Sequence, residues 1–108
     1  MIDMVNARII HGGSIRAVAV TSDDIGRVRG KIVVVPNLSP EPVLRVIIDG
    51  AAGVIARVGA VTAHGAAVLR EAGVPAAVAV DFPDDWIGRE IILRADKGYV
   101  GLVNHGQQ

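Results

Sequence analysis

The chain contains no cysteine among its 108 residues. This absence excludes disulfide bonds, thiolate metal ligands and a thiol nucleophile. Aromatic residues are almost as scarce, with one Trp, one Tyr and one Phe. The hydrophobic core must therefore be built from aliphatic side chains, and no aromatic platform is available for stacking nucleic-acid bases.

Net charge and long apolar runs are also missing. The 11 basic and 11 acidic residues cancel, and without a basic stripe we expect no nucleic-acid partner. No apolar run approaches the roughly 20 residues that span a membrane. The first residues lack the basic and then apolar pattern of a signal peptide. We therefore expect no membrane association and a cytoplasmic location, which is the default for a chain without disulfides.

What the chain does have is aliphatic residues and glycine. Hydrophobic residues make up 51% of the sequence, and 13 glycines are spread along it. The many β-branched residues favour strands, and this length is enough for one core and too short for two. We predict a single domain over residues 1–108, with frayed ends at 1–8 and 104–108.

Apolar periodicity and turn residues predict the order of the elements. Two helices are expected, from Pro40 to about Ile48 and from His64 to Ala72, the second with a glycine stop at Gly73. Strands are expected where apolar residues alternate or run continuously. These segments are 16–21, 31–35, 53–56, 76–80, 90–93 and 99–103. The order predicts an α/β fold in which short helices cover a mixed, mostly buried sheet.

The candidate chemistry is concentrated between Gly59 and Val78, in the run GAVTAHGAAVLREAGVPAAV. Thr62 is a plausible N-cap, which places His64 in the first turn of the second helix. The positive end of a helix dipole disfavours a charged imidazolium and favours a negative group attached to the ring. We therefore expect His64 to be a neutral nucleophile.

Small residues surround this histidine, among them Gly59, Ala63 and Gly65. They leave the ring open to a large reactant. No second histidine or carboxylate stands at helical spacing from His64. A local metal site or a local proton-relay triad is therefore not expected.

This segment resembles the phosphohistidine segment of phosphoenolpyruvate-utilising enzymes, such as pyruvate phosphate dikinase, phosphoenolpyruvate synthase and enzyme I of the sugar phosphotransferase system. Their shared pattern is roughly G-G-x-T-S-H-A-A-x-x-A-R-E-x-G-I-P-A-V-V. The chain departs from the family pattern at Ala60, Ala63 and Arg94, among other positions. The resemblance extends over about residues 12–103. Ten positions match, namely Gly59, Thr62, His64, Ala66, Arg70, Glu71, Gly73, Pro75, Ala76 and Val78.

The resemblance implies a swivelling β/β/α domain that carries a phosphoryl or pyrophosphoryl group on His64, with Thr62 as a phosphate contact or only an N-cap. The chain has no nucleotide-binding glycine loop and no acidic cluster for Mg²⁺. The resemblance therefore implies that this chain binds no cofactor or metal itself. ATP with Mg²⁺, or phosphoenolpyruvate, is then expected on partner subunits: an ATP-binding subunit, and an acceptor subunit of the phosphoenolpyruvate/pyruvate or another type, both acting in trans.

Several alternatives remain open. Arg70 and Glu71 form either a solvated helix face or a contact with a partner. Trp86 is either a docking anchor or a cover over one edge of the core. Two other functions fit the same fold: an interaction or regulatory module that is not phosphorylated, and the swivelling small subunit of a dehydratase-like enzyme.

Overall fold

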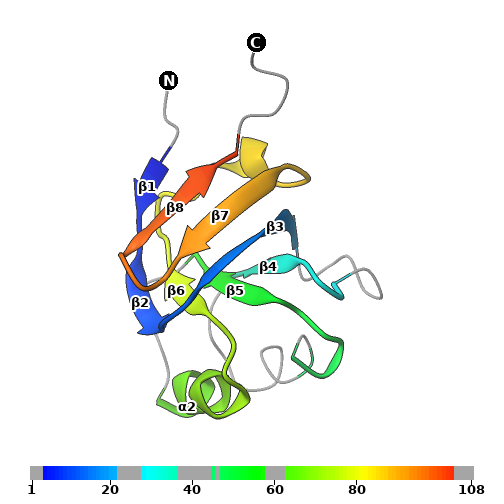
Figure 1. Ribbon diagram of the computed structural model, residues 1–108, viewed down its shortest axis with the longest axis vertical. Helices are drawn as coiled ribbons and strands as arrows, with labels where there is room; N and C mark the ends of the chain where they lie inside the picture. The colour runs from blue at the N-terminus through cyan, green and yellow to red at the C-terminus, as the bar shows by residue number, and fades with distance from the viewer. Residues whose placement is uncertain (1–3, 22–27, 37–44, 46, 58–62, 104–108) are drawn as a thin grey trace.

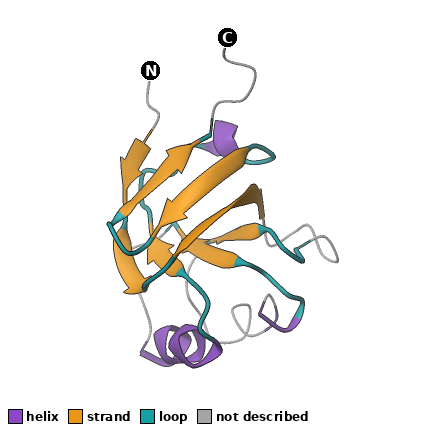
Figure 2. Cartoon of the chain, viewed as in Figure 1, coloured by secondary structure: helices purple, strands orange, loops and turns teal. Residues whose placement is uncertain are grey.

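The computed structural model describes residues 4–21, 28–36, 45, 47–57 and 63–103. Within these ranges the chain forms eight strands, the helix α2 (Ala63–Ala72) and the 3-10 turn η1 (Asp84–Trp86) (Figures 1 and 2). The strands are β1 (Met4–Asn6), β2 (Arg8–His11), β3 (Ser14–Thr21), β4 (Ile32–Val35), β5 (Gly53–Ala56), β6 (Ala76–Val78), β7 (Glu90–Arg94) and β8 (Tyr99–Leu102).

All eight strands belong to one sheet with the order β1-β8-β7-β3-β4-β5-β6-β2. The strands β3, β4, β5 and β6 are parallel neighbours, and the other pairs are antiparallel. β1 and β2 lie at opposite ends of this order, although only Ala7 separates them in the chain. The sheet therefore curls back on itself, with a parallel half and an antiparallel half that share β3 (Figure 1).

The core consists of two clusters, one on each face of the parallel half. In β4, Ile32 and Val34 face the inner cluster, which lies between the two halves of the sheet. The alternate residues Val33 and Val35 face the outer cluster, where Leu69 of α2 packs. This strand is buried on both faces, which explains its uninterrupted apolar sequence. The result is a β/β/α arrangement of three layers, as predicted for a swivelling domain of the α/β class.

Most of the predicted elements are confirmed, with differences at the ends. The last predicted strand before Trp86 ends at Val78 rather than Val80. The expectation of a frayed segment over residues 1–8 is wrong from residue 4 onward. Met4–Asn6 pairs with β8, and Arg8 pairs with Val78 of β6, so hydrogen bonds to distant strands hold this segment.

Some predictions fall partly or wholly outside the described residues. Of the helix expected over 40–48, the structure describes residues 45, 47 and 48, all in helical conformation. Residues 104–108, predicted to be frayed, are not described. Within the described part of the chain, no helix has the length and apolar character needed to cross a membrane.

Candidate functional site

The helix α2 connects two neighbouring parallel strands. It follows the carboxyl end of β5 and leads into the amino end of β6, and these strands pair in parallel. In such a crossover the helix runs back along the sheet. The first turn of α2 therefore lies toward the carboxyl ends of β5 and β6, which we call the carboxyl edge (Figure 1).

The helix ends where its sequence provides a glycine. Gly73 has a φ of 71°, a left-handed conformation that costs other residues more than glycine. Its N–H donates to the carbonyl of Arg70 at 3.2 Å, and the N–H of Val74 donates to the carbonyl of Leu69 at 3.2 Å. These two bonds form the Schellman motif and satisfy carbonyls that the helix end leaves open. The predicted helix stop is confirmed.

One side of α2 is buried and the other is exposed. Gly65, Ala66 and Leu69 are buried, and Leu69 has no exposed surface. His64 is exposed as the second residue of the helix. The first turn contains no acidic residue, so no carboxylate of its own offsets the positive end of the helix dipole. The structure thus places an accessible imidazole at an electropositive helix start.

The structure describes some of the other predicted site residues and not others. Gly59 and Thr62 lie outside the described residues. Ala63 is the first residue of α2. Arg70 and Glu71 are exposed toward its far end, where both a solvated face and a partner contact remain compatible with their position.

Trp86 is not an exposed docking anchor. Trp86 is only 4% exposed, and its ring packs edge-on against Phe82 with the ring centroids 5.7 Å apart. The 3-10 turn η1 directs the indole into the inner cluster while Asp84 and Asp85 stay exposed. The second interpretation, a cover over the core, is the one that the structure supports.

Arg57, which immediately follows β5, was not anticipated from the sequence. One of its terminal nitrogens, Nη2, donates to the carbonyl oxygen of Phe82 at 2.8 Å and also to the carboxylate of Asp84. Its guanidinium carbon lies 5.8 Å from the centroid of the Phe82 ring. These contacts join the end of β5, just before the connection to α2, to the segment that follows β6.

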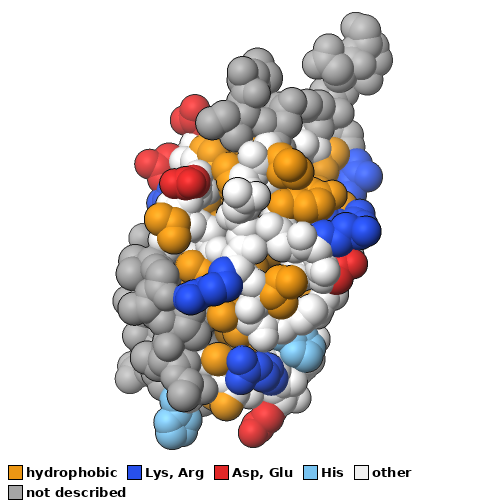
Figure 3. Space-filling model, turned by 90° about the vertical axis from the view of Figure 1, so that its left-hand side faces the viewer, with side chains coloured by type: hydrophobic (Ala, Val, Ile, Leu, Met, Phe, Trp, Pro, Cys, Tyr) orange, Lys and Arg blue, Asp and Glu red, His pale blue; other side chains and the backbone are white. Residues whose placement is uncertain are grey.

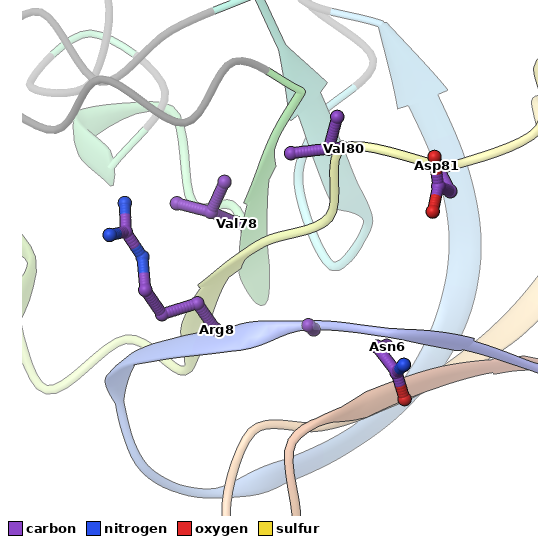
Figure 4. Close-up of a pocket in the computed structure, with 6 residues that line it drawn as sticks. Asn6, Arg8, Val78, Val80 and Asp81 are labelled. Carbon is purple, nitrogen blue, oxygen red and sulfur yellow. The ribbon is translucent and has the colours of Figure 1, made fainter.

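A groove lies at the carboxyl edge, between the N-terminal strands β1 and β2 and the segment that leaves β6 (Figure 4). We call it the edge groove. Its volume is about 480 Å³. Its lining residues are Asn6, Ala7, Arg8, Val78, Val80 and Asp81. Among the described residues, no three His, Cys, Asp or Glu side chains come together in a way that could hold a metal ion.

Solved structures resemble this fold at low sequence identity. A UPF0107 protein, determined by NMR in solution, is 16% identical with a TM-score of 0.69, and the match covers 94% of this chain and 99% of that chain. Aconitase X of Thermococcus kodakaraensis, in its holo form, is 17% identical with a TM-score of 0.68, covering 94% and 98%. The microcin C7 self-immunity protein MccF, as an apo inactive mutant, is 13% identical with a TM-score of 0.61, covering 93% of this chain and 41% of its own.

These likenesses establish the fold alone. No curated protein matches the sequence. The family model described as "PEP-utilising enzyme, mobile domain" matches residues 27–98, which include all of α2 and both of its neighbouring strands. The chain therefore belongs to the family of mobile domains of phosphoenolpyruvate-utilising enzymes.

Proposed function

We propose that the chain is a phosphoryl carrier, in which His64 accepts a phosphoryl or pyrophosphoryl group and passes it between the active sites of partner proteins. The observation that carries the proposal is the exposed His64 in the first turn of α2, inside the segment that matches the mobile-domain family. The buried side of α2 supports it as well, because Ala66 and Leu69 hold the helix against the sheet.

The proposed reaction needs little from the chain beyond this imidazole. The unprotonated ring nitrogen attacks the phosphorus of the donor, and an N–P bond forms as the P–O bond to the leaving group breaks. The electron pair of that bond leaves with the oxygen of the donor, and the other ring nitrogen keeps its proton. The positive end of α2 favours the negative phosphoryl group on His64 by about 0.3–1 kcal/mol. Onward transfer reverses these steps with an acceptor in place of the donor.

The partners follow from what a carrier requires. ATP with Mg²⁺, or phosphoenolpyruvate, would bind to other subunits: an ATP-binding subunit and an acceptor subunit of the phosphoenolpyruvate/pyruvate or another type. The exposed Arg70 and Glu71 on α2 are candidate contacts for them. Gly59, Thr62, Ala63 and Gly65 would form the surroundings of the phosphoryl group, with Thr62 as its contact or as the helix cap.

The test is to isolate the protein from its own cells in alkaline buffer and to map phosphoryl groups by mass spectrometry. We expect a phosphoryl group on His64 that is stable in base and lost in acid. The His64→Ala variant should carry none, and His11→Ala, the matched control on β2, should be labelled like the wild type. Retention of the label by His64→Ala, or its absence from the wild type, would contradict the proposal.

A second candidate is the swivelling small subunit of a dehydratase-like enzyme. The observation that favours it is the end-to-end similarity to the chain of Thermococcus kodakaraensis aconitase X, which covers 94% of this chain and 98% of that one. This function predicts that the protein co-purifies with a large catalytic subunit and carries no phosphoryl group on any histidine. The same isolation from cells therefore separates the two candidates.

A further inference from the structure

Glu71 shares the exposed face of α2 with His64. The helix runs from Ala63 to Ala72, and an α-helix turns by about 100° and rises by about 1.5 Å with each residue. The step from His64 to Glu71 therefore completes about two full turns, so the two side chains project in nearly the same direction, about 10.5 Å apart along the axis. Both residues are exposed. At the end of the molecule that α2 occupies, Figure 3 shows histidine, acidic and basic side chains reaching one surface.

Arg70, the neighbouring charged residue, projects in another direction. It lies about 120° around the helix axis from His64. Its position also has a reason within the helix itself, because a basic side chain in the last turn interacts favourably with the negative end of the helix dipole. The exposed Arg70 is therefore explained by the stability of α2, without any contact to a partner.

The position of Glu71 has no such explanation. A carboxylate in the last turn faces the negative end of the helix dipole, which disfavours it. A basic side chain three or four positions away could offset this effect, but these positions hold Ala67, Val68, Val74 and Pro75. Among the residues that the structure describes, no hydrogen bond or ion pair holds the Glu71 carboxylate. A residue that departs from the local rules of stability without compensation is typical of a functional position.

A protein that phosphorylates His64 has to cover Glu71 as well. The reacting ring nitrogen must come within about 3.5 Å of the phosphorus, so the walls of the partner's active site contact the helix around His64. A standard interface buries about 800 Å² on each partner, which corresponds to about 16 Å in every direction from its centre. Glu71 lies inside this radius. On the face between the two residues, Ala67 and Val68 have short, half-buried side chains that leave the approach open.

We propose that Glu71 is a specificity-determining contact of the carrier reaction, in which it forms an ion pair with a basic side chain beside the active site of the protein that phosphorylates His64. This inference rests on the proposed carrier function. A basic side chain fits because opposite charges across an interface steer association and fix its register. It lies about 10 Å from the phosphorus, which is the separation of the two positions along α2. Of the two charged residues near the end of the helix, Glu71 rather than Arg70 selects the partner.

The experiment measures the initial rate at which the soluble extract of the source cells labels His64, with [γ-³²P]ATP or [³²P]phosphoenolpyruvate as the probe. A range of carrier concentrations gives the KM for the carrier and the maximal rate. The test variants are Glu71→Gln and Glu71→Lys, and Glu71→Asp retains the charge. Arg70→Gln tests the direction of the two side chains. The matched control is Asp85→Asn, which changes an exposed carboxylate of η1 at the opposite end of the molecule from α2 (Figures 1 and 2).

A second reaction, with potassium phosphoramidate as a small chemical donor, reports the intrinsic reactivity of His64 without any protein donor. Mass spectrometry of the peptide that contains His64 follows it in every variant. Thermal unfolding checks that each variant is folded, and Glu71→Gln should be at least as stable as the wild type because it removes a carboxylate from the negative end of α2. A contact with the partner changes only the KM with the extract, whereas a structural role also changes the rate with phosphoramidate.

We expect Glu71→Gln to raise the KM about fivefold at low salt, which is the effect of losing one exposed ion pair. Glu71→Lys should raise it about 25-fold, because repulsion replaces attraction. Glu71→Asp and Asp85→Asn should stay within about twofold of the wild type, and Arg70→Gln should raise the KM less than Glu71→Gln. Maximal rates and phosphoramidate rates should not change.

A wild-type KM for Glu71→Lys, or an equal rise for Arg70→Gln and Glu71→Gln, would overturn the proposed contact and leave the carrier function intact. A parallel fall in the phosphoramidate rate of the Glu71 variants would overturn it in the same way. A wild type whose His64 the extract does not label would overturn both proposals.

Discussion

Replacing Arg57 by alanine should lower the free energy of unfolding by about 2 kcal/mol. The guanidinium makes three contacts, and each has a typical value. The hydrogen bond to the carbonyl of Phe82, 2.8 Å long and partly buried, contributes about 1 kcal/mol. The guanidinium over the Phe82 ring adds about 0.5 kcal/mol at an exposed site. The ion pair with Asp84, whose side chain is 83% exposed, adds about 0.5 kcal/mol because water screens it.

Urea denaturation followed by circular dichroism measures this loss, with Asp84→Ala as the matched single variant. Asp84→Ala removes only the screened ion pair, so it should cost about 0.5 kcal/mol. Arg57→Lys keeps a cation but loses the planar fork, so we expect it to lose about half as much stability as Arg57→Ala. In the double variant, the coupling between the two positions should be about 0.5 kcal/mol.

The ordering of these variants tests the reasoning more sharply than any single value. If the carbonyl bond dominates, Arg57→Ala is clearly more costly than Asp84→Ala. Equal losses for the two variants would mean that the ion pair is the main contact. A loss below about 0.5 kcal/mol for Arg57→Ala, the usual range of a neutral surface change, would refute the claim that Arg57 ties the end of β5 to the segment after β6.

Two further predictions concern the packing of α2 and of β5. Leu69→Ala should lower the free energy of unfolding by about 2–5 kcal/mol in urea denaturation, because Leu69 is fully buried in the outer cluster; a smaller loss would mean that the helix does not pack as described. Gly53→Ala should cost about 1–3 kcal/mol in the same assay, because an added Cβ would lie 3.1 Å from Cγ2 of Ile15 and 3.4 Å from the carbonyl of Pro75; a stability equal to that of the wild type would mean that these neighbours yield freely.

The elements that the sequence predicts well are those with local signals. The buried strand β4 is a continuous apolar run between Gly30 and Pro36, and it forms at Ile32–Val35. The helix α2 begins one residue before its predicted start and ends at Ala72 as predicted. Its end is encoded by Gly73, which needs no distant contact to stop a helix. The position of His64 in a first helical turn is therefore confirmed, whereas its phosphorylation stays a prediction.

The elements that the sequence does not predict depend on contacts between distant residues. β1 has only three residues, and its pairing with Tyr99–Gly101 of β8 joins opposite ends of the chain. No periodicity is detectable in so short a segment. The role of Arg57 cannot be predicted from the sequence either, because its partners Phe82 and Asp84 lie 25 and 27 residues away. For Trp86, the acidic neighbours point to an exposed loop, and the fold instead turns the indole inward beside Phe82.

The stabilisation energy that α2 can supply at His64 is small compared with the barrier reduction that catalysis requires. The surroundings described in the structure supply an open approach and the positive end of α2, which contributes about 0.3–1 kcal/mol to binding a negative group. Enzymes lower reaction barriers by about 8–23 kcal/mol. In the proposed carrier function, His64 is therefore a reactant rather than a complete active site, and the remaining stabilisation would come from the partner proteins. The same reasoning explains why the surface that selects those proteins would matter as much to a carrier as its nucleophile.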